Sequence, residues 1–413
     1  MLYQLSYFRN IRRNAKDSLP YCECKGSANF RKNKFSAFFY FPPAEAHGRK
    51  SGFRPPPSCG IPHGGRCAAV LSAPTHAISS RYAIFVSVKE WIPFFAELGE
   101  RLRPFGRTPQ SRETIAQACR ANEWFRPEEI VRAVETIRRD MLDAGKLESW
   151  SSRYALPAAR PRRVLVVMAG NIPLVGFFDL LCVVASGHRC AVKPSGKDRI
   201  LMEYVVRTMR EIDPAVPVEL CGGETPADAV IATGSDNAAR YFRARYAEIP
   251  TLLRGSRQSA AVLSGAETPA QLTGLADDIW AYSGLGCRNV SLLFLPEGYT
   301  PALTMPAMNA KYRNNYRQQR ALCEMEGRPF VDLGCAVAVE QQEFPQALSL
   351  LSLARYRSLD EVERWLAAHD RQLQCVVSEC LSHSRRTDFG RAQSPALTDY
   401  PDDCDVMEFL SGI

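Results

Sequence analysis

The chain has 413 residues, of which 46% are hydrophobic and 23% charged, which is typical of a globular protein long enough for more than one core. Its longest apolar run, residues 172–185, is interrupted by Gly176 and Asp179. The run is shorter than the roughly 18 apolar residues that cross a bilayer, so no membrane span is expected. The fourteen cysteines show neither zinc-like spacing nor a disulfide framework, so we expect no metal site and reduced thiols in a cytoplasmic protein.

The net charge of +8 is concentrated at one end of the chain. Residues 1–82 carry 13 Lys and Arg against 3 Asp and Glu, or +10, which leaves −2 for the other 331 residues. Runs such as Arg54-Pro55-Pro56-Pro57 cannot form a helix or strand. We therefore predict a basic disordered extension over residues 1–85, with an organelle transit peptide or an upstream start codon as alternatives. It has no recognisable binding module, so no nucleic-acid partner is expected.

The ordered part is predicted to begin with helices at 86–102, 110–122 and 127–147. Pro127 followed by two acids is a favourable helix start. From residue 163 the pattern alternates: strands are expected at 164–168, 190–192, 218–220 and 229–232, and helices at 174–186 and 200–212. Further along, a strand at 290–295, a helix at 359–369 and a strand at 374–377 are predicted. Strand–helix–strand alternation of this length predicts an α/β protein with a doubly wound parallel sheet.

Three short motifs follow predicted strands. Asn171 follows the strand at 164–168, where its side-chain amide could stabilise an oxyanion, although a turn-forming Asn before Pro173 is equally consistent. Lys193 and Ser195 follow the next strand and could contact ribose and phosphate, although loop lysines are usually solvated. Gly234 and Ser235 precede a helix whose N–H groups could face a pyrophosphate, but an unliganded N-cap explains Ser235 as well.

Cys287 lies in the sequence Tyr-Ser-Gly-Leu-Gly-Cys-Arg-Asn. Gly284 and Gly286 would let a substrate approach the backbone closely. If a helix began at Cys287, its dipole would lower the pKa of the thiol, and Arg288 would add to that field. A cysteine in a glycine-rich loop is as often structural, so the local sequence leaves both interpretations open.

The order and spacing of these motifs resemble those of the aldehyde dehydrogenase superfamily. Asn-x-Pro is followed by Lys-Pro-Ser, Thr-Gly-Ser and Gly-x-Gly-Cys. Residues 86–413 resemble more closely the bacterial long-chain acyl-CoA reductases (LuxC-like). That resemblance depends on Ala-Gly-Asn-Ile-Pro, Arg254-Gly255-Ser256, the Cys287 motif and the ending that contains Asp399-Tyr400 and Asp405-Val406-Met407.

The resemblance implies an aldehyde dehydrogenase-like fold with a Rossmann-type cofactor domain and an α/β catalytic domain. We expect helices and the cofactor domain over residues 86–280, the catalytic domain over 281–385 and a return segment over 386–413. By the same resemblance Cys287 is the nucleophile, and Asn171 and the Cys287 N–H form the oxyanion hole. Lys193 and Ser195 would bind the adenosine end of the cofactor, and Gly234 and Ser235 its pyrophosphate side.

Two departures from the family pattern bear on the reaction. Where hydrolytic members carry the glutamate that activates water, this chain has Leu253, which cannot accept a proton. A thioester on Cys287 should therefore exchange with a thiol instead of water. Where NAD-preferring members often carry a ribose-binding glutamate, this chain has Gly196, followed by Lys197 and Arg199. Loss of the acid and gain of cations favour the 2′-phosphate of NADPH.

Other acids and histidines are not assigned a role. Many relatives carry an acid that contacts the nicotinamide ribose further along the chain; Glu340 or Glu343 could stand in for it, but the surrounding motif of the family is absent. His188, His369 and His383 lie in no catalytic motif and are interpreted as surface or core residues.

The sequence thus predicts an NADPH-dependent acyl-CoA reductase that forms a fatty aldehyde through a Cys287 thioester, an oxidoreductase acting on an aldehyde or oxo group. A reductase or CoA-acylating dehydrogenase for a small acyl thioester or acyl phosphate is an alternative. A non-catalytic acyl-binding or scaffold protein is an alternative from another class. An acyl-CoA or acyl-carrier thioester is the expected ligand. The resemblance further implies a homo-oligomer and an acyl-activating enzyme as partner.

Overall fold

The computed structural model describes residues 88–413 except 159, 223 and 224. The extension predicted over residues 1–85 lies outside the described residues. Within the described ranges, no helix is long and apolar enough to cross a bilayer.

The described chain begins with the helices α3 (Val88–Leu102), α4 (Pro109–Ala121), α5 (Pro127–Met141) and α6 (Ala144–Ser151). Thr108 caps α4 by accepting the Ser111 N–H, and Pro127 opens α5 as predicted. The single helix predicted over 127–147 is wrong. The chain leaves helical geometry at Leu142, and the Asp143 carboxylate accepts the Lys146 N–H at 2.9 Å, which starts α6 as a separate helix.

The first sheet consists of β1 (Arg163–Val167), β2 (Arg189–Lys193), β3 (Val218–Leu220), β4 (Ala229–Thr233) and β5 (Thr251–Arg254). Its order is β3-β2-β1-β4-β5, and all its pairs are parallel. It is accompanied by α7 (Phe177–Ala185), α8 (Arg199–Ile212) and α9 (Asp236–Arg245). Val164 and Val166 pack with α7 and α8, while Leu165 and Val167 pack on the other face with Phe242 of α9. Both faces are buried, as the continuous apolar strand predicts.

The second sheet consists of β6 (Gln258–Val262), β7 (Val290–Pro296), β8 (Val331–Asp332), β9 (Val337–Glu340), β10 (Leu350–Tyr356), β11 (Leu373–Val377) and β12 (Arg386–Thr387). The order is β12-β11-β6-β7-β10-β9-β8, and β8 runs antiparallel to β9. The associated helices are α10 (Pro269–Trp280), α11 (Ala310–Glu326) and α12 (Leu359–Ala368). The predicted β7, α12 and β11 are present, and the two sheets confirm the α/β fold class.

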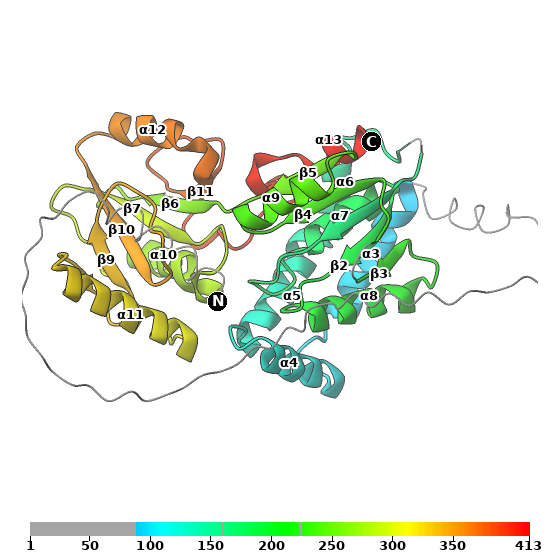
Figure 1. Ribbon diagram of the computed structural model, residues 1–413, viewed down its shortest axis with the longest axis horizontal. Coiled ribbons are helices and arrows are strands. Elements are labelled where there is room, and N and C mark those ends of the chain that lie inside the picture. The colour runs from blue at the N-terminus through cyan, green and yellow to red at the C-terminus, as the bar shows by residue number, and fades with distance from the viewer. Residues whose placement is uncertain (1–87, 159, 223–224) are drawn as a thin grey trace, which may run out of the picture. The chain divides into compact units, whose positions relative to one another are not determined.

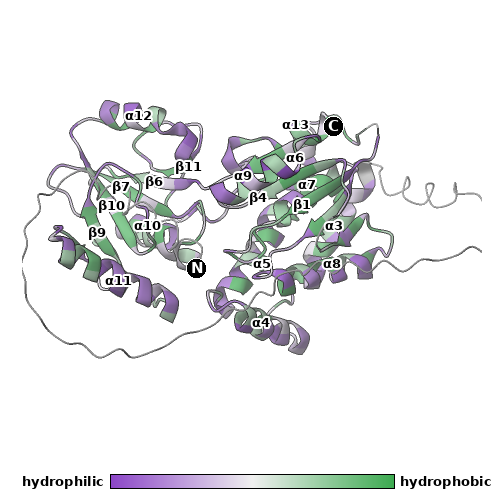
Figure 2. Cartoon of the chain, in the orientation of Figure 1, coloured by the Kyte–Doolittle hydropathy of each residue, from purple (hydrophilic) through white to green (hydrophobic). Residues whose placement is uncertain are grey.

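The last helix, α13 (Val406–Ser411), packs against α7 of the first sheet (Figure 1). Val406, Met407 and Leu410 are fully buried in the same core as β1. The Tyr154 hydroxyl donates to Asp405, the N-cap residue of α13, at 2.8 Å. Figure 2 shows apolar colour concentrated in the strands and α7, and polar colour along most of α11. The end of the chain is thus part of the first core.

Candidate active site

The predicted cofactor residues lie together at the carboxyl edge of the first sheet. Val167, the last residue of β1, pairs with Lys193 of β2 and Ala232 of β4. The loops that carry Asn171, Ser195 and Gly234 therefore start side by side. The chain also reverses direction across this sheet between β3 and β4, and open α/β sheets bind ligands at such a switch point.

Ser195 and Gly170 are in close contact within this edge. A Cβ built on Gly170 would lie 2.6 Å from the Cβ and Oγ of Ser195, so only glycine fits before Asn171. The Ser195 hydroxyl accepts the Lys197 N–H at 3.3 Å. In contrast, a Cβ built on Gly196 would have no heavy atom within 4 Å. The space beside Gly196 is therefore open to a ligand group.

The Gly234–Ser235 loop starts α9 as predicted. Ser235 is its N-cap and accepts the Ala238 N–H at 3.4 Å, while its role toward a pyrophosphate stays a prediction. The adjacent Thr233 hydroxyl is buried without a hydrogen-bond partner. Asp236 places a carboxylate in the first turn of α9, but its Oδ1 accepts the Ser256 N–H at 3.1 Å. That contact directs the negative charge to the linker between β5 and β6.

A strained turn, residues 281–289, connects α10 to β7 and contains Cys287. Tyr282, Ser283 and Gly284 have φ angles of 52°, 57° and 67°, all in the left-handed region. Such angles cost about 1 kcal/mol or more for residues with a Cβ, so other contacts must hold the turn. Asn309 Nδ2 donates to Ser283 Oγ at 3.2 Å. The Tyr282 N–H donates to the carboxylate of Glu129 on α5.

The Asn289 side chain hydrogen-bonds to backbone groups of the turn and of the end of α10. Its Oδ1 accepts the Gly286 N–H at 2.8 Å, and its Nδ2 donates to the carbonyls of Asp278, Ile279 and Ala281 at 3.1, 3.2 and 2.9 Å. The side chain is 4% exposed. Asn289 thus satisfies the carbonyls at the end of α10 and fixes the backbone directly before Cys287.

Cys287 is solvent-exposed at this turn. The helix considered at Cys287 is absent: residues 286–289 form a turn and bend, and β7 begins at Val290. Desolvation by the crowded protein around the thiol raises its pKa to about 11, and Arg288 opposes that shift, in the predicted direction. Cys287 is therefore accessible, and no helix dipole acts on its thiol.

A buried serine of β6 holds the backbone at Cys287. The Ser259 hydroxyl of β6 donates to the Cys287 carbonyl at 2.9 Å and accepts the Cys375 N–H of β11 at 3.2 Å. Ser259 is fully buried.

Asn171 and Cys287 come from different sheets and meet at this turn. Asn171 Nδ2 donates to the Leu285 carbonyl at 2.5 Å. Ile172 packs against Ala281 and Tyr282. The structure therefore brings Asn171 to the turn that contains Cys287, and the roles of both residues stay predictions.

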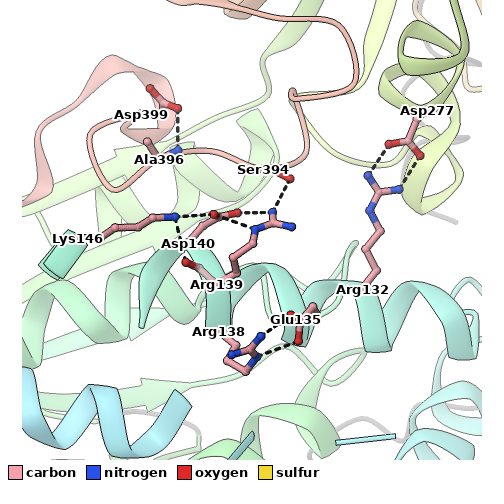
Figure 3. Close-up of polar contacts among 10 residues, drawn as sticks. All are labelled: Arg132, Glu135, Arg138, Arg139, Asp140, Lys146, Asp277, Ser394, Ala396 and Asp399. Carbon is pink, nitrogen blue, oxygen red and sulfur yellow. Dashed lines mark hydrogen bonds and ion pairs between the residues drawn. The ribbon is translucent and has the colours of Figure 1, made fainter. Parts of the chain in front are cut away.

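Charged residues of α5 also hold this turn, and the sequence motifs did not reveal them. Arg132 makes two hydrogen bonds to Asp277 of α10, one of them 2.5 Å long, and its guanidinium lies 5.8 Å from the Tyr282 ring centre (Figure 3). Burial raises the pKa of Glu129, the partner of the Tyr282 N–H, to about 7. Charged residues on a helix are usually solvated. Only their contacts with α10 and the Cys287 turn therefore show that Arg132 and Glu129 belong to the site.

The unassigned residues lie in structural settings. Glu340 is exposed and pairs with Arg355 at 3.2 Å, and Glu343 is exposed. His188 is fully buried and lies 2.9 Å from the Leu410 carbonyl. His369 stacks on Trp365 at 3.9 Å, and His383 accepts the Arg385 N–H at 3.1 Å. Leu253 lies in β5 and packs with the α9-side cluster.

Solved structures share this architecture. An aldehyde dehydrogenase from Burkholderia cenocepacia, described as putative, matches with a TM-score of 0.55 and 15% identity, covering 75% of this chain and 79% of that one. A NAD-dependent benzaldehyde dehydrogenase from Corynebacterium glutamicum matches with a TM-score of 0.51 and 12% identity over 73% and 79%. This chain has the aldehyde dehydrogenase fold.

An indole-3-acetaldehyde dehydrogenase from P. syringae, in a complex that contains NAD+, has the same fold, with a TM-score of 0.53, 15% identity and 77% coverage of each chain. No family model matches the sequence. No curated protein matches it either. At these identities, the aldehyde dehydrogenase fold of this chain rests on the arrangement of its two sheets.

Proposed function

We propose that this protein reduces acyl thioesters to aldehydes with NADPH, through a covalent thioester on Cys287. The contact of Asn171 with Leu285, two residues before Cys287, is the observation that carries the proposal. The contact holds the Asn171 amide, which follows a strand of the first sheet, against the turn that carries the exposed Cys287. A thiol and a fixed amide donor are the groups that acyl transfer requires.

The carboxyl edge of the first sheet fits a dinucleotide. The buried Thr233 hydroxyl lacks a partner there, and the space beside Gly196 is open. Lys197 and Arg199 are exposed next to Gly196, and cations at this place favour a 2′-phosphate. NADPH, when bound, would supply the hydride that releases the acyl group as an aldehyde.

The residues of this chain would carry out the acyl transfer. Cys287 loses its proton to solvent, helped by Arg288, and its sulfur bonds to the carbonyl carbon of the thioester. The carbonyl oxygen takes up the electron pair and accepts hydrogen bonds from Asn171 and the Cys287 N–H. When the carbonyl re-forms, the bond to the carrier sulfur breaks, and the carrier leaves as a thiolate that takes up a proton.

The absence of a carboxylate at position 253 supports reduction over hydrolysis. Leu253 is part of an apolar cluster with Val230 and Ala232 and cannot activate water. The acyl group on Cys287 should therefore persist until a thiol or a hydride removes it. The same groups would serve CoA-dependent aldehyde oxidation in reverse.

Product analysis tests this proposal. The protein is incubated with NADPH and butanoyl-, octanoyl- or hexadecanoyl-CoA, and aldehyde and free acid are quantified. We expect aldehyde as the main product with at least one chain length, and none with Cys287→Ala. Free acid as the main product would contradict the Leu253 argument. No aldehyde from any acyl-CoA would favour a substrate such as an acyl phosphate or a non-catalytic protein. The homo-oligomer and the acyl-activating partner remain proposals.

A further inference from the structure

The segment 170–174, which carries Asn171, ends at a residue in a left-handed conformation. Leu174 has a φ angle of 55° and is 3% exposed. Because such an angle is unfavourable for a residue with a Cβ, contacts with other parts of the chain must hold it. The Leu174 N–H donates to Asp198 Oδ2 at 2.7 Å, and its carbonyl accepts the Phe177 N–H at 3.0 Å. The bond to Asp198 therefore holds this end of the segment from outside its own loop.

The Asp198 side chain bonds to this other loop instead of to its own helix. Asp198 is the N-cap residue of α8, where an aspartate usually accepts an N–H of the helix, but its side chain makes no capping hydrogen bond. It is 4% exposed, and within the described residues its Oδ1 is buried without a hydrogen-bond partner. Burial raises the pKa of Asp198 well above its usual range, although the Leu174 N–H opposes that shift. The carboxyl is thus buried where its acceptor serves Leu174.

The other end of the segment rests on the same short loop before α8. A Cβ built on Gly170 would lie 3.3 Å from the Cβ of Asp198, in addition to its contact with Ser195. The Asp198 N–H donates to the Ser195 carbonyl at 3.0 Å, which closes this loop. Asn171 lies between the two held ends, and its Nδ2 donates to a carbonyl of the Cys287 turn. The position of the Asn171 amide therefore depends on Asp198.

We propose that Asp198 is a positioning residue that holds Asn171 at the Cys287 turn through its hydrogen bond to Leu174. This role rests on the proposed function, in which Asn171 donates to the carbonyl oxygen of the acyl thioester. Without the Asp198 acceptor, the buried Leu174 N–H loses its partner, and the left-handed residue loses the contact that holds it. The segment then shifts, and the Asn171 amide leaves the place where the oxyanion forms. A displacement of about 1 Å can slow a reaction about 100-fold.

The test measures two reactions of Cys287 in the full-length protein. One is formation of the acyl-enzyme from butanoyl-, octanoyl- or hexadecanoyl-CoA, followed by intact mass spectrometry after quenching. The other is alkylation by iodoacetamide, which builds up no charge on a carbonyl oxygen and so does not need Asn171.

The variants separate the acceptor from the bulk of the side chain. Asp198→Ala and Asp198→Leu remove the acceptor, and the second keeps a branched side chain of similar shape. Asp198→Asn keeps an acceptor oxygen for the Leu174 N–H. Asp213→Ala is the matched control, because Asp213 lies at the other end of α8 and its carboxylate also accepts a backbone N–H, that of Ala215 at 2.8 Å. Each change at Asp198 is also combined with Asn171→Ala.

We expect Asp198→Ala and Asp198→Leu to slow acyl-enzyme formation about 10- to 100-fold. Asp198→Asn should stay within about 3-fold of wild type, and Asp213→Ala should be unchanged. Iodoacetamide alkylation should stay within about 2-fold in every variant. In the Asn171→Ala background, loss of the Asp198 acceptor should have no further effect, because Asp198 acts through Asn171.

An unchanged acylation rate without the acceptor would overturn this role alone, and so would Asp198→Asn as slow as Asp198→Ala. An equal fall of acylation and alkylation, or the same further loss in the Asn171→Ala background, would show that Asp198 only supports the fold. Hydrogen exchange of the wild-type protein needs no variant to fold: the Leu174 N–H should be protected, and exchange at the rate of an unfolded chain would contradict the role. If the wild-type protein acquires no acyl mass, this role and the proposed function both fail.

Discussion

The loops at the carboxyl edge of the first sheet and the turn that contains Cys287 are built in different ways. Lys193 and Gly234 directly follow parallel strands, and Ser235 caps the next helix. Cys287 instead lies in a turn with three consecutive left-handed residues, held by side chains from α5 and β6. The residues predicted to bind the cofactor are thus positioned by the local sequence, whereas the predicted nucleophile is positioned by contacts with residues far away in the chain.

The largest effect on the rate of acyl transfer is expected at Asn171, which contacts the Cys287 turn from a loop of the first sheet. Asn171→Ala should lower the rate of acyl transfer to Cys287 about 100- to 1,000-fold, because the developing oxyanion loses a donor. The measurement is single-turnover acylation by the panel of acyl-CoA esters. Asn237→Ala, on the exposed side of α9, is the control and should retain the full rate. A loss of less than threefold in Asn171→Ala would show that Asn171 only holds the Leu285 carbonyl.

A substitution at the carboxyl edge of the first sheet should change the relative affinities for NADPH and NADH. It should leave the reactivity of Cys287 unchanged. Gly196→Glu has room for its side chain and places a negative charge next to the site proposed for the 2′-phosphate. We expect NADPH affinity to fall about 10-fold, or roughly 1.4 kcal/mol, with NADH affinity equal or higher. Isothermal titration measures both, and iodoacetamide alkylation of Cys287 is the control. Equal weakening of NADPH and NADH binding would contradict the assignment.

Substitutions at two glycines with similar φ angles distinguish the effect of backbone strain on stability from its effect on acylation. Gly284 in the Cys287 turn and Gly298 after β7 have φ angles of 67° and 75°, and a Cβ meets no atom closer than 3.5 Å at either position. Gly284→Ala and Gly298→Ala should therefore each lower the free energy of unfolding by about 1–2 kcal/mol. Only Gly284→Ala should also slow acylation of Cys287. Denaturant titration and acylation rates are compared, and equal acylation rates would show that the turn tolerates the strain.

The smallest effect is expected on the pH dependence of the free energy of unfolding. Burial raises the pKa of Glu129 from 4.5 to about 7, so folding binds a proton there. Its stabilising contribution is complete below about pH 4.5 and is lost as pH rises through about 7. Glu129→Gln should flatten the fall in stability between pH 5 and 8 and raise the free energy of unfolding at pH 8 by about 1 kcal/mol. Denaturant titrations at both pH values check this. A residual slope is expected from Asp278, whose pKa burial also raises to about 7; an unchanged slope would contradict the assignment.

Much of the first sheet could be predicted because its strands are continuous apolar runs followed by loops with recognisable motifs. The two-residue strands β8 and β12 carry too little pattern to be detected. The break at Leu142 depends on the Asp143 cap, which the periodicity of 127–147 hides. Of the candidate site, Cys287 and Asn171 were predicted from the resemblance in motif order and spacing. Glu129 and Ser259 were missed, because each contacts the Cys287 turn from a place far away in the chain.

The most direct test of the central claim is the mass of the protein after incubation with acyl-CoA in the absence of NADPH. Intact mass spectrometry followed by peptide mapping locates any added acyl group. We predict one acyl group on Cys287, released by hydroxylamine and absent from Cys287→Ala. No added mass with any chain length, or an acyl group on another residue that persists in Cys287→Ala, would contradict the account.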